Sequence, residues 1–128
     1  MLTRIFLLIF VTLSSIGDEA YSQQKSELIN RGEKLFQEQG CIACHGPKTT
    51  QGPRLENLYG SLVTLDSGKV IKVDEKYLKE SILDPQKKVV RGFSAIMPSY
   101  RNILKEDDLR AVIVYLKNLK TDTSKTRP

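Results

Sequence analysis

The two cysteines and the single histidine of this chain lie within five residues, in the stretch Cys41-Ile42-Ala43-Cys44-His45. Thiolates and imidazoles are nucleophiles and metal ligands. Their clustering therefore predicts that the chemistry of the chain is concentrated in this one segment. Several kinds of site use two cysteines separated by two residues, and the neighbouring sequence discriminates among them.

Three of these alternatives fit poorly. A disulfide between Cys41 and Cys44 would close a loop of four residues, and so short a loop confers little stability through chain entropy. A thioredoxin-like redox pair belongs to a strand-to-helix connection, whereas here a helical pattern precedes the cysteines and Gly46-Pro47 follows the histidine. A structural zinc site needs four ligands, and this segment supplies three.

The order Cys-x-x-Cys-His is instead the attachment signature of c-type haem. Two thiols at this spacing can add to the two vinyl groups at one edge of a porphyrin and form thioethers. The next residue then presents an imidazole to the iron. The sequence therefore predicts that Cys41 and Cys44 bind one haem covalently and that His45 is an axial ligand of its iron.

A second axial ligand is expected in a haem electron carrier, and methionine sulfur commonly fills this place and favours ferrous iron. Apart from Met1, the chain has one methionine, Met97, which lies 52 residues after His45 and precedes Pro98. Methionines also serve simply to fill core space, but their scarcity here favours ligation by Met97. A labile Met97, which would leave the iron free to bind a small gas, is a further alternative.

The surroundings of the predicted haem can also be assigned. Gly52-Pro53 could supply a backbone carbonyl that accepts a hydrogen bond from His45 and orients its ring. Phe93 and other apolar residues would enclose the ring, although each of them is equally expected in an ordinary core. The predicted walls are Leu55, Leu58, Leu78, Ile82, Val89, Val90, Phe93 and Ile96.

Three helices are predicted from apolar periodicity and from terminating residues. The first begins near Ser26 and ends at Gly40, immediately before the cysteines. The second follows Asp74, a good N-cap, and ends at Pro85. The third spans residues 106–120, with acidic residues in its first turn, where the helix dipole favours negative charge.

The connections between these helices are long and rich in glycine and proline. Between His45 and Asp74 lie 28 residues, for which we expect a short helical turn at residues 55–59 and a small hairpin or an extended loop around residues 66–68. So long an irregular segment is unusual in a small domain. It is consistent with a cofactor, rather than side chains alone, at the centre of the fold.

The chain of 128 residues suits one small domain. Residues 1–22 have the layout of a secretory signal, with Arg4, an apolar run over residues 5–13 and cleavage after Ser22. The apolar run is shorter than the roughly 20 residues that span a bilayer, so an uncleaved anchor is the less favoured alternative. We therefore predict a domain over residues 23–120 and a disordered tail over residues 121–128.

The chain is basic, with a formal net charge of +5 that becomes +6 without residues 1–22. Such a charge favours solubility, or steering toward an acidic protein partner. Nucleic acid is disfavoured as a partner because basic residues are scattered among acidic ones and no recognised binding motif is present.

The sequence between residues 27 and 119 resembles the class I cytochromes c. The helical pair Gly32 and Phe36 is similar to the pair that packs against an aromatic residue of the last helix in that family, for which Tyr115 is the candidate. The segments YGSLV, DEKYLKESILDP and VVRGFSAIMPSY are most similar to the cytochrome c domain fused to subunit II of some bacterial haem-copper oxidases. The chain lacks the copper-site cysteines and the membrane hairpin of that subunit.

This resemblance implies an all-α fold of three to five helices around one covalently attached haem, with His45 and Met97 as axial ligands. It implies a monohaem carrier of single electrons between respiratory partners, not itself an enzyme, or alternatively a fixed subunit of a terminal oxidase or dehydrogenase. The partners would be redox proteins with an acidic docking face. The location would be periplasmic or otherwise exported, with membrane association only through partners or an uncleaved signal.

Two departures from the family pattern carry expectations of their own. Lys105 stands before the last helix where a serine or threonine cap is usual. The chain has no tryptophan, so the haem propionates would need other donors. The candidates for this role are Tyr59, Tyr77, Arg54 and Arg91.

Overall fold

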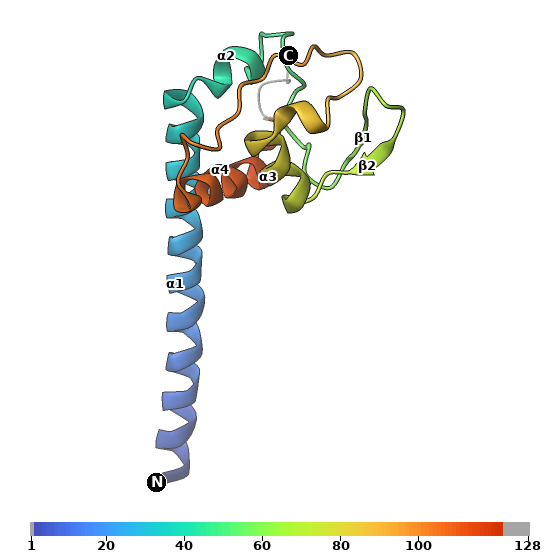
Figure 1. Ribbon diagram of the computed structural model, residues 1–128. Helices are drawn as coiled ribbons and strands as arrows, with labels where there is room; N and C mark the ends of the chain where they lie inside the picture. The colour runs from blue at the N-terminus through green and yellow to red at the C-terminus, as the bar shows by residue number, and fades with distance from the viewer. Residues whose placement is uncertain (1, 122–128) are drawn as a thin grey trace, which may run out of the picture.

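The computed structural model describes the backbone of residues 2–121 and the side chains of residues 17–121. Helices joined by long loops form the domain (Figure 1), and within the described residues two short strands accompany them. The all-α fold is therefore confirmed. In chain order the elements are α1 (Leu2–Glu38), α2 (Cys41–His45), β1 (Leu62–Thr64), β2 (Val70–Lys72), α3 (Glu75–Leu83), the 3-10 helix η1 (Pro85–Lys87) and α4 (Glu106–Asn118).

Helix α1 begins much earlier than the predicted start near Ser26, because it is continuous from Leu2 to Glu38. No proline interrupts this stretch, so the backbone can continue the helix through the predicted signal segment. Its first part extends away from the rest of the domain (Figure 1). Among the described residues, no helix combines the length and the apolar character needed to cross a membrane.

The C-terminal part of α1 crosses α4 at a close approach of the two backbones. A Cβ atom at Gly32 would lie 2.1 Å from the carbonyl oxygen of Ala111 and 2.6 Å from the Cβ of Tyr115, so only glycine fits there. One turn later, the rings of Phe36 and Tyr115 pack with their centroids 5.5 Å apart at an angle of 51°. The predicted packing of Gly32 and Phe36 against Tyr115 is confirmed.

The ends of the other helices follow from local sequence. The Asp74 carboxylate accepts a hydrogen bond of 2.7 Å from the Tyr77 N–H and so caps α3. Helix α3 ends at Leu83, just before Pro85. Helix α4 ends at Asn118 rather than at residue 120. The N-cap residue Lys105, which precedes α4, makes no side-chain capping bond within the described part of the chain, as expected.

The loop after α2 contains consecutive turns where we expected a helical turn at residues 55–59. Asn57 adopts a left-handed backbone conformation with φ of 58°, which a continuing helix does not allow. Its N–H donates to the Leu119 carbonyl oxygen at 2.9 Å. The loop is thus bound to the end of α4, and this tertiary bond is the reason that the local helical pattern is not followed.

The predicted hairpin is confirmed. Strands β1 and β2 pair antiparallel in the register Val63↔Ile71, with Gly68 at φ of 84° in the turn between them. An isolated bridge between Leu65 and Val90 joins the hairpin to the segment that follows η1. The hairpin therefore connects the long loop to the second irregular segment, which carries Met97.

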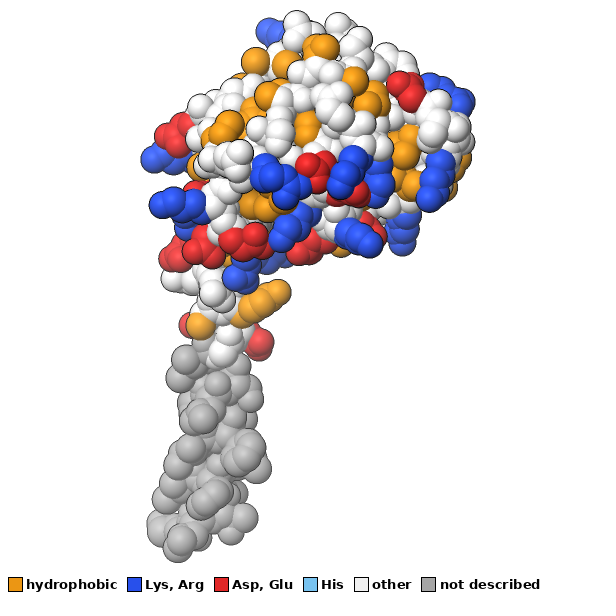
Figure 2. Space-filling view, viewed as in Figure 1, with side chains coloured by type: hydrophobic (Ala, Val, Ile, Leu, Met, Phe, Trp, Pro, Cys, Tyr) orange, Lys and Arg blue, Asp and Glu red, His pale blue; other side chains and the backbone are white. Residues whose placement is uncertain are grey.

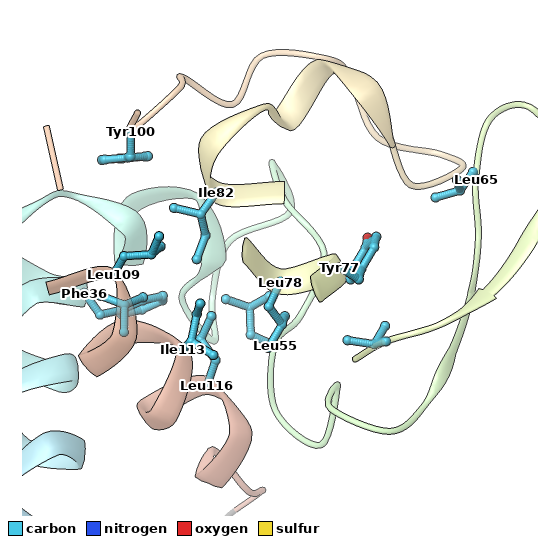
Figure 3. Packing of buried hydrophobic residues seen from close by; sticks show 12 residues of the cluster. Phe36, Leu55, Leu65, Tyr77, Leu78, Ile82, Tyr100, Leu109, Ile113 and Leu116 are labelled. Atoms are coloured by element: carbon cyan, nitrogen blue, oxygen red, sulfur yellow. The ribbon is translucent and has the colours of Figure 1, made fainter. Parts of the chain in front are cut away.

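The hydrophobic core lies between α1, α3 and α4 and extends into the loops. Figure 3 shows Phe36 and Leu109 close together where α1 meets α4, with Leu78 and Ile82 reaching the same region from α3. Burial of this apolar surface is the main stabilising term of the fold. The buried cluster comprises Phe36, Leu55, Leu65, Val73, Tyr77, Leu78, Ile82, Tyr100, Leu109, Val112, Ile113 and Leu116.

The contact at Gly32 gives a first prediction. Replacement of Gly32 by alanine forces α1 and α4 apart, and we expect the free energy of unfolding to fall by about 1 to 3 kcal/mol. Denaturant unfolding of the haem-bearing protein measures this change. The substitution Glu33→Ala, at the next and exposed position of α1, is the control and should change stability by less than about 0.5 kcal/mol. Equal effects of the two substitutions would contradict the proposed close contact.

Candidate functional site

A single large cavity brings together the residues that the sequence analysis singled out. It has about 1310 Å³ of empty space, part of it open to solvent, and its lining is predominantly apolar. Cys41, Cys44 and His45 line it from α2, and Met97 lines it from the segment between η1 and α4. Residues separated by half of the chain therefore face one space.

All of the predicted wall residues line this cavity, and so does Pro53. They come from the loop after α2, from α3 and from the segment after η1. Four further residues line the cavity, although no sequence pattern assigned them to it: Phe36, Tyr100, Val112 and Leu116. Val112 and Leu116 belong to the apolar face of α4, so the helical pattern marked them as buried but could not show that they face a cavity.

The position of α2 follows from the end of α1. Gly40 has φ of 77° and turns the chain between α1 and α2, and the Ala43 N–H donates to its carbonyl oxygen at 3.0 Å. Both cysteines are half-buried, and no disulfide joins them. Burial raises the pKa of the Cys41 thiol, which is consistent with an apolar surrounding.

The ring of His45 is held by the following loop. Its Nδ1 lies 2.9 Å from the carbonyl oxygen of Pro53. A carbonyl can only accept, so Nδ1 carries the proton and Nε2 keeps a free lone pair that can bind a metal. Gly52 makes this approach possible, because a Cβ atom there would lie 2.7 Å from Cε1 of His45. The structure thus supplies the carbonyl that we expected from Gly52-Pro53.

The segment that carries Met97 is attached to α3 and to α1 by hydrogen bonds. The Ser99 hydroxyl donates to the Leu83 carbonyl oxygen at 2.6 Å, and the Tyr100 N–H donates to the Ile82 carbonyl oxygen at 3.1 Å. The phenol of Tyr100 donates to the carbonyl oxygen of Gln39 at 2.9 Å. Burial raises the pKa of Tyr100, which keeps this donor protonated at neutral pH.

Tyr100 was missed by the sequence analysis although it joins the two sides of the site. Its side chain is 8% exposed and lines the cavity. Gln39 and Tyr100 are 61 residues apart in the chain, and no local pattern links them. The sequence offered one weak indication of its role, namely that this aromatic residue lies three positions after Met97.

Of the predicted haem-pocket residues Pro53, Phe93 and Tyr59, the first two line the cavity. Tyr59 does not line it. Its ring lies below Lys117, whose Nζ is 5.1 Å from the ring centroid. The turns at Asn57 and Gly60 direct this part of the loop toward the end of α4, which explains the difference.

The other residues considered for the propionates are also placed. Tyr77 lines the cavity. Arg54 instead forms an ion pair of 2.8 Å with Glu56, and its guanidinium also donates to the Pro47 carbonyl oxygen at 3.2 Å. Arg91 does not belong to the cavity lining. Tyr77 is therefore the candidate of this group that the geometry brings to the site.

The residues present fit a haem. The lining is apolar, as a porphyrin face requires, and the buried Ser81 Oγ has no hydrogen-bond partner among the described residues although Ser81 lines the cavity. The residues that the structure describes contain no group of three or more His, Cys, Asp or Glu side chains that could hold a metal ion.

The charges around the site are largely neutralised in pairs. Lys87 forms an ion pair of 3.2 Å with Asp84, and Lys88 pairs with Glu80. The hydrogen bonds from Arg101 and Lys87 lower the pKa of Asp84. Lys48, three residues after His45, has no ion-pair partner within the part of the chain that the structure describes.

Comparison with known proteins agrees with this site. Residues 29–120 match the family Cytochrome c. Over 108 residues the chain is 36% identical to cytochrome c oxidase subunit 2 of Alkalihalophilus pseudofirmus. The aligned region covers 81% of this chain and 30% of that protein. The chain thus spans less than a third of the length of that relative.

Three observations lead to one conclusion. They are the family match, the Cys-x-x-Cys-His segment on α2 and the apolar cavity that brings His45 and Met97 together. The chain belongs to the cytochrome c family, whose function is haem-based electron transfer, and Cys41 and Cys44 fit one covalently bound haem c.

Proposed function

We propose that this protein transfers single electrons between respiratory partners through one haem whose iron has His45 and Met97 as axial ligands. The observation that carries the proposal is that both residues line one cavity, while the Nδ1 bond to Pro53 leaves Nε2 of His45 free for the iron. When bound, the haem supplies an iron that alternates between the ferric and ferrous states.

The protein residues have distinct tasks in this proposal. Cys41 and Cys44 hold the porphyrin edge, so that it cannot dissociate. The carbonyl of Pro53 fixes the tautomer and orientation of His45. The Met97 thioether favours the ferrous state, and the apolar walls, among them Phe93, exclude water from the iron.

The M97A variant tests the ligand assignment. Loss of the sulfur atom should abolish the weak long-wavelength sulfur-to-iron band of the ferric protein and lower the reduction potential, because the thioether no longer favours ferrous iron. Absorption spectra and a redox titration of the purified holoprotein measure both effects. Ile103→Ala, at a position that is 56% exposed and does not line the cavity, is the control. Persistence of the band in M97A would exclude Met97 as a ligand.

We further propose that the electron partner has an acidic docking face. The formal net charge of +5 supports this, and so does Lys48 close to the site. On the face drawn in Figure 2, basic and acidic side chains are intermixed in a band across the domain, and the pairs formed by Lys87 and Lys88 reduce the contribution of these two lysines. The attraction would therefore come from the net charge and from a few unpaired cations rather than from a dense ring of lysines.

Electron-transfer rates at different ionic strengths test the acidic partner. Between 0.01 M and 0.15 M salt the screening length falls from about 30 Å to about 8 Å, so the second-order rate with an acidic redox protein should decrease severalfold. Lys48→Gln should lower the rate at low salt more than Lys69→Gln, which removes the same charge from the hairpin turn. Rates that do not depend on salt would contradict steering.

A second candidate function is that of a fixed subunit of a terminal oxidase or dehydrogenase complex. The similarity to an oxidase subunit over 81% of this chain favours it. Purification in mild detergent from the native cells discriminates the two. We expect the protein to be recovered as a haem-stained monomer if it is a mobile carrier, whereas co-purification with oxidase subunits at constant stoichiometry would support the fixed role.

The proposed place of action is the periplasm or another exported location. Covalent attachment of c-type haem takes place outside the bacterial cytoplasm, and the segment of residues 1–22 has the composition of a secretory signal. Any association with a membrane would then occur through protein partners or through an uncleaved signal segment.

A further inference from the structure

The geometry points to Gln86 as a positioning residue that holds Met97 at the haem site. This inference rests on the proposed function, in which Met97 is an iron ligand. The side-chain amide of Gln86 donates a hydrogen bond of 3.2 Å from Nε2 to the backbone carbonyl oxygen of Met97. Both residues line the cavity, but they belong to different segments, since Gln86 is part of η1.

The segment around Met97 has few other attachments. Upstream, the Arg91 N–H donates to the Thr64 carbonyl oxygen at 2.9 Å. Downstream, Ser99 binds the Leu83 carbonyl. The remaining backbone bonds of residues 92–98 are local to the segment. Among the described residues, the hydrogen bond from Gln86 is therefore the bond that connects residues 92–98 to another element of the fold.

Met97 itself cannot rely on its neighbours in sequence. Pro98 has no N–H to donate, and Ile96, although it lines the cavity, is 62% exposed and therefore only partly packed. Within the described part of the chain, the Gln86 amide is the partner that the structure gives to the backbone of Met97. Without it, the carbonyl would be free and the segment could move away from the cavity more easily.

The donor is held in place by the structure of η1. Pro85 is buried and fixes the backbone at the start of the turn, and the Lys87 N–H donates to the Asp84 carbonyl oxygen at 3.1 Å. Gln86 thus extends from a short rigid turn toward the Met97 segment. A neutral amide also suits this place, because a carboxylate could not donate to the carbonyl and would repel it.

The expected effect is on the equilibrium between ligation by Met97 and its release. The net free energy that such a hydrogen bond contributes corresponds to roughly a two- to tenfold change in this equilibrium constant. An external ligand that replaces Met97 reports this equilibrium, because its apparent affinity rises in proportion to the fraction of protein in which the methionine is released.

The experiment is a titration of the ferric holoprotein with imidazole, followed by the loss of the sulfur-to-iron band. We expect Q86A and Q86E to raise the apparent affinity for imidazole about two- to tenfold over the wild-type protein. Q86E keeps the size of the side chain, removes the donor and adds repulsion of the carbonyl, so its effect should equal or exceed that of Q86A. Lys87→Ala, at the next residue of η1, is the matched control and should leave the affinity unchanged.

Each outcome has a defined meaning. Unchanged affinity in both Gln86 variants, or a change in Q86A without one in Q86E, would overturn the positioning role, because packing rather than the hydrogen bond would then hold the segment. The sulfur-to-iron band of M97A separates this result from a failure of the proposed function. If that band persists, the ligand assignment itself is wrong. If it disappears while the Gln86 variants bind imidazole as the wild type does, only the role of Gln86 is refuted.

Discussion

The close approach of α1 and α4 at Gly32 is the constraint on which the site depends. Because a side chain at this position would meet the Ala111 backbone at 2.1 Å, the two helices can cross only where glycine stands. The crossing holds the C-terminal part of α1 against α4, and Gly40 then turns the chain so that Cys41, Cys44 and His45 face the cavity. The same crossing brings Val112 and Leu116 of α4 to the cavity wall. One backbone contact thus places both the attachment segment and part of the pocket.

The two sides of the site are held by different means. On the side of His45, the bonds are local: Pro53 lies eight residues further on in the chain and binds the ring directly. On the side of Met97, they connect distant segments, with Tyr100 bound to Gln39 and Ser99 bound to Leu83. Local bonds lose little chain entropy when they form, whereas distant ones depend on the assembled fold. The Met97 side is therefore the part of the site whose geometry is most sensitive to the rest of the protein.

The charged side chains matter more for recognition of a partner than for stability of the fold. Ion pairs such as Lys87 with Asp84 are exposed, and exposed pairs contribute little to stability. They do, however, cancel charge near the cavity, so that the basic character seen in the composition is not concentrated there. The apolar lining and the net charge are thus independent features: the first fits the haem, and the second would act in the proposed encounter with partners.

Much of the chemistry was determined by the sequence alone. The spacing of Cys41, Cys44 and His45, the scarcity of methionine and the apolar patterns of α3 and α4 are local properties, and local properties can be read along the chain. The cap at Asp74 and the turn at Gly68 belong to the same class, since each depends on a few neighbouring residues.

Other features were decided only by the tertiary structure. Tyr59 turns away from the cavity because Asn57 is bound to Leu119, and Tyr100 reaches Gln39 across 61 residues. Gln86 donates to Met97 because η1 happens to lie beside the Met97 segment. The physical reason is common to all three: a hydrogen bond between distant residues is specified by where the packed helices bring them, and the pattern of either partner alone does not contain that information.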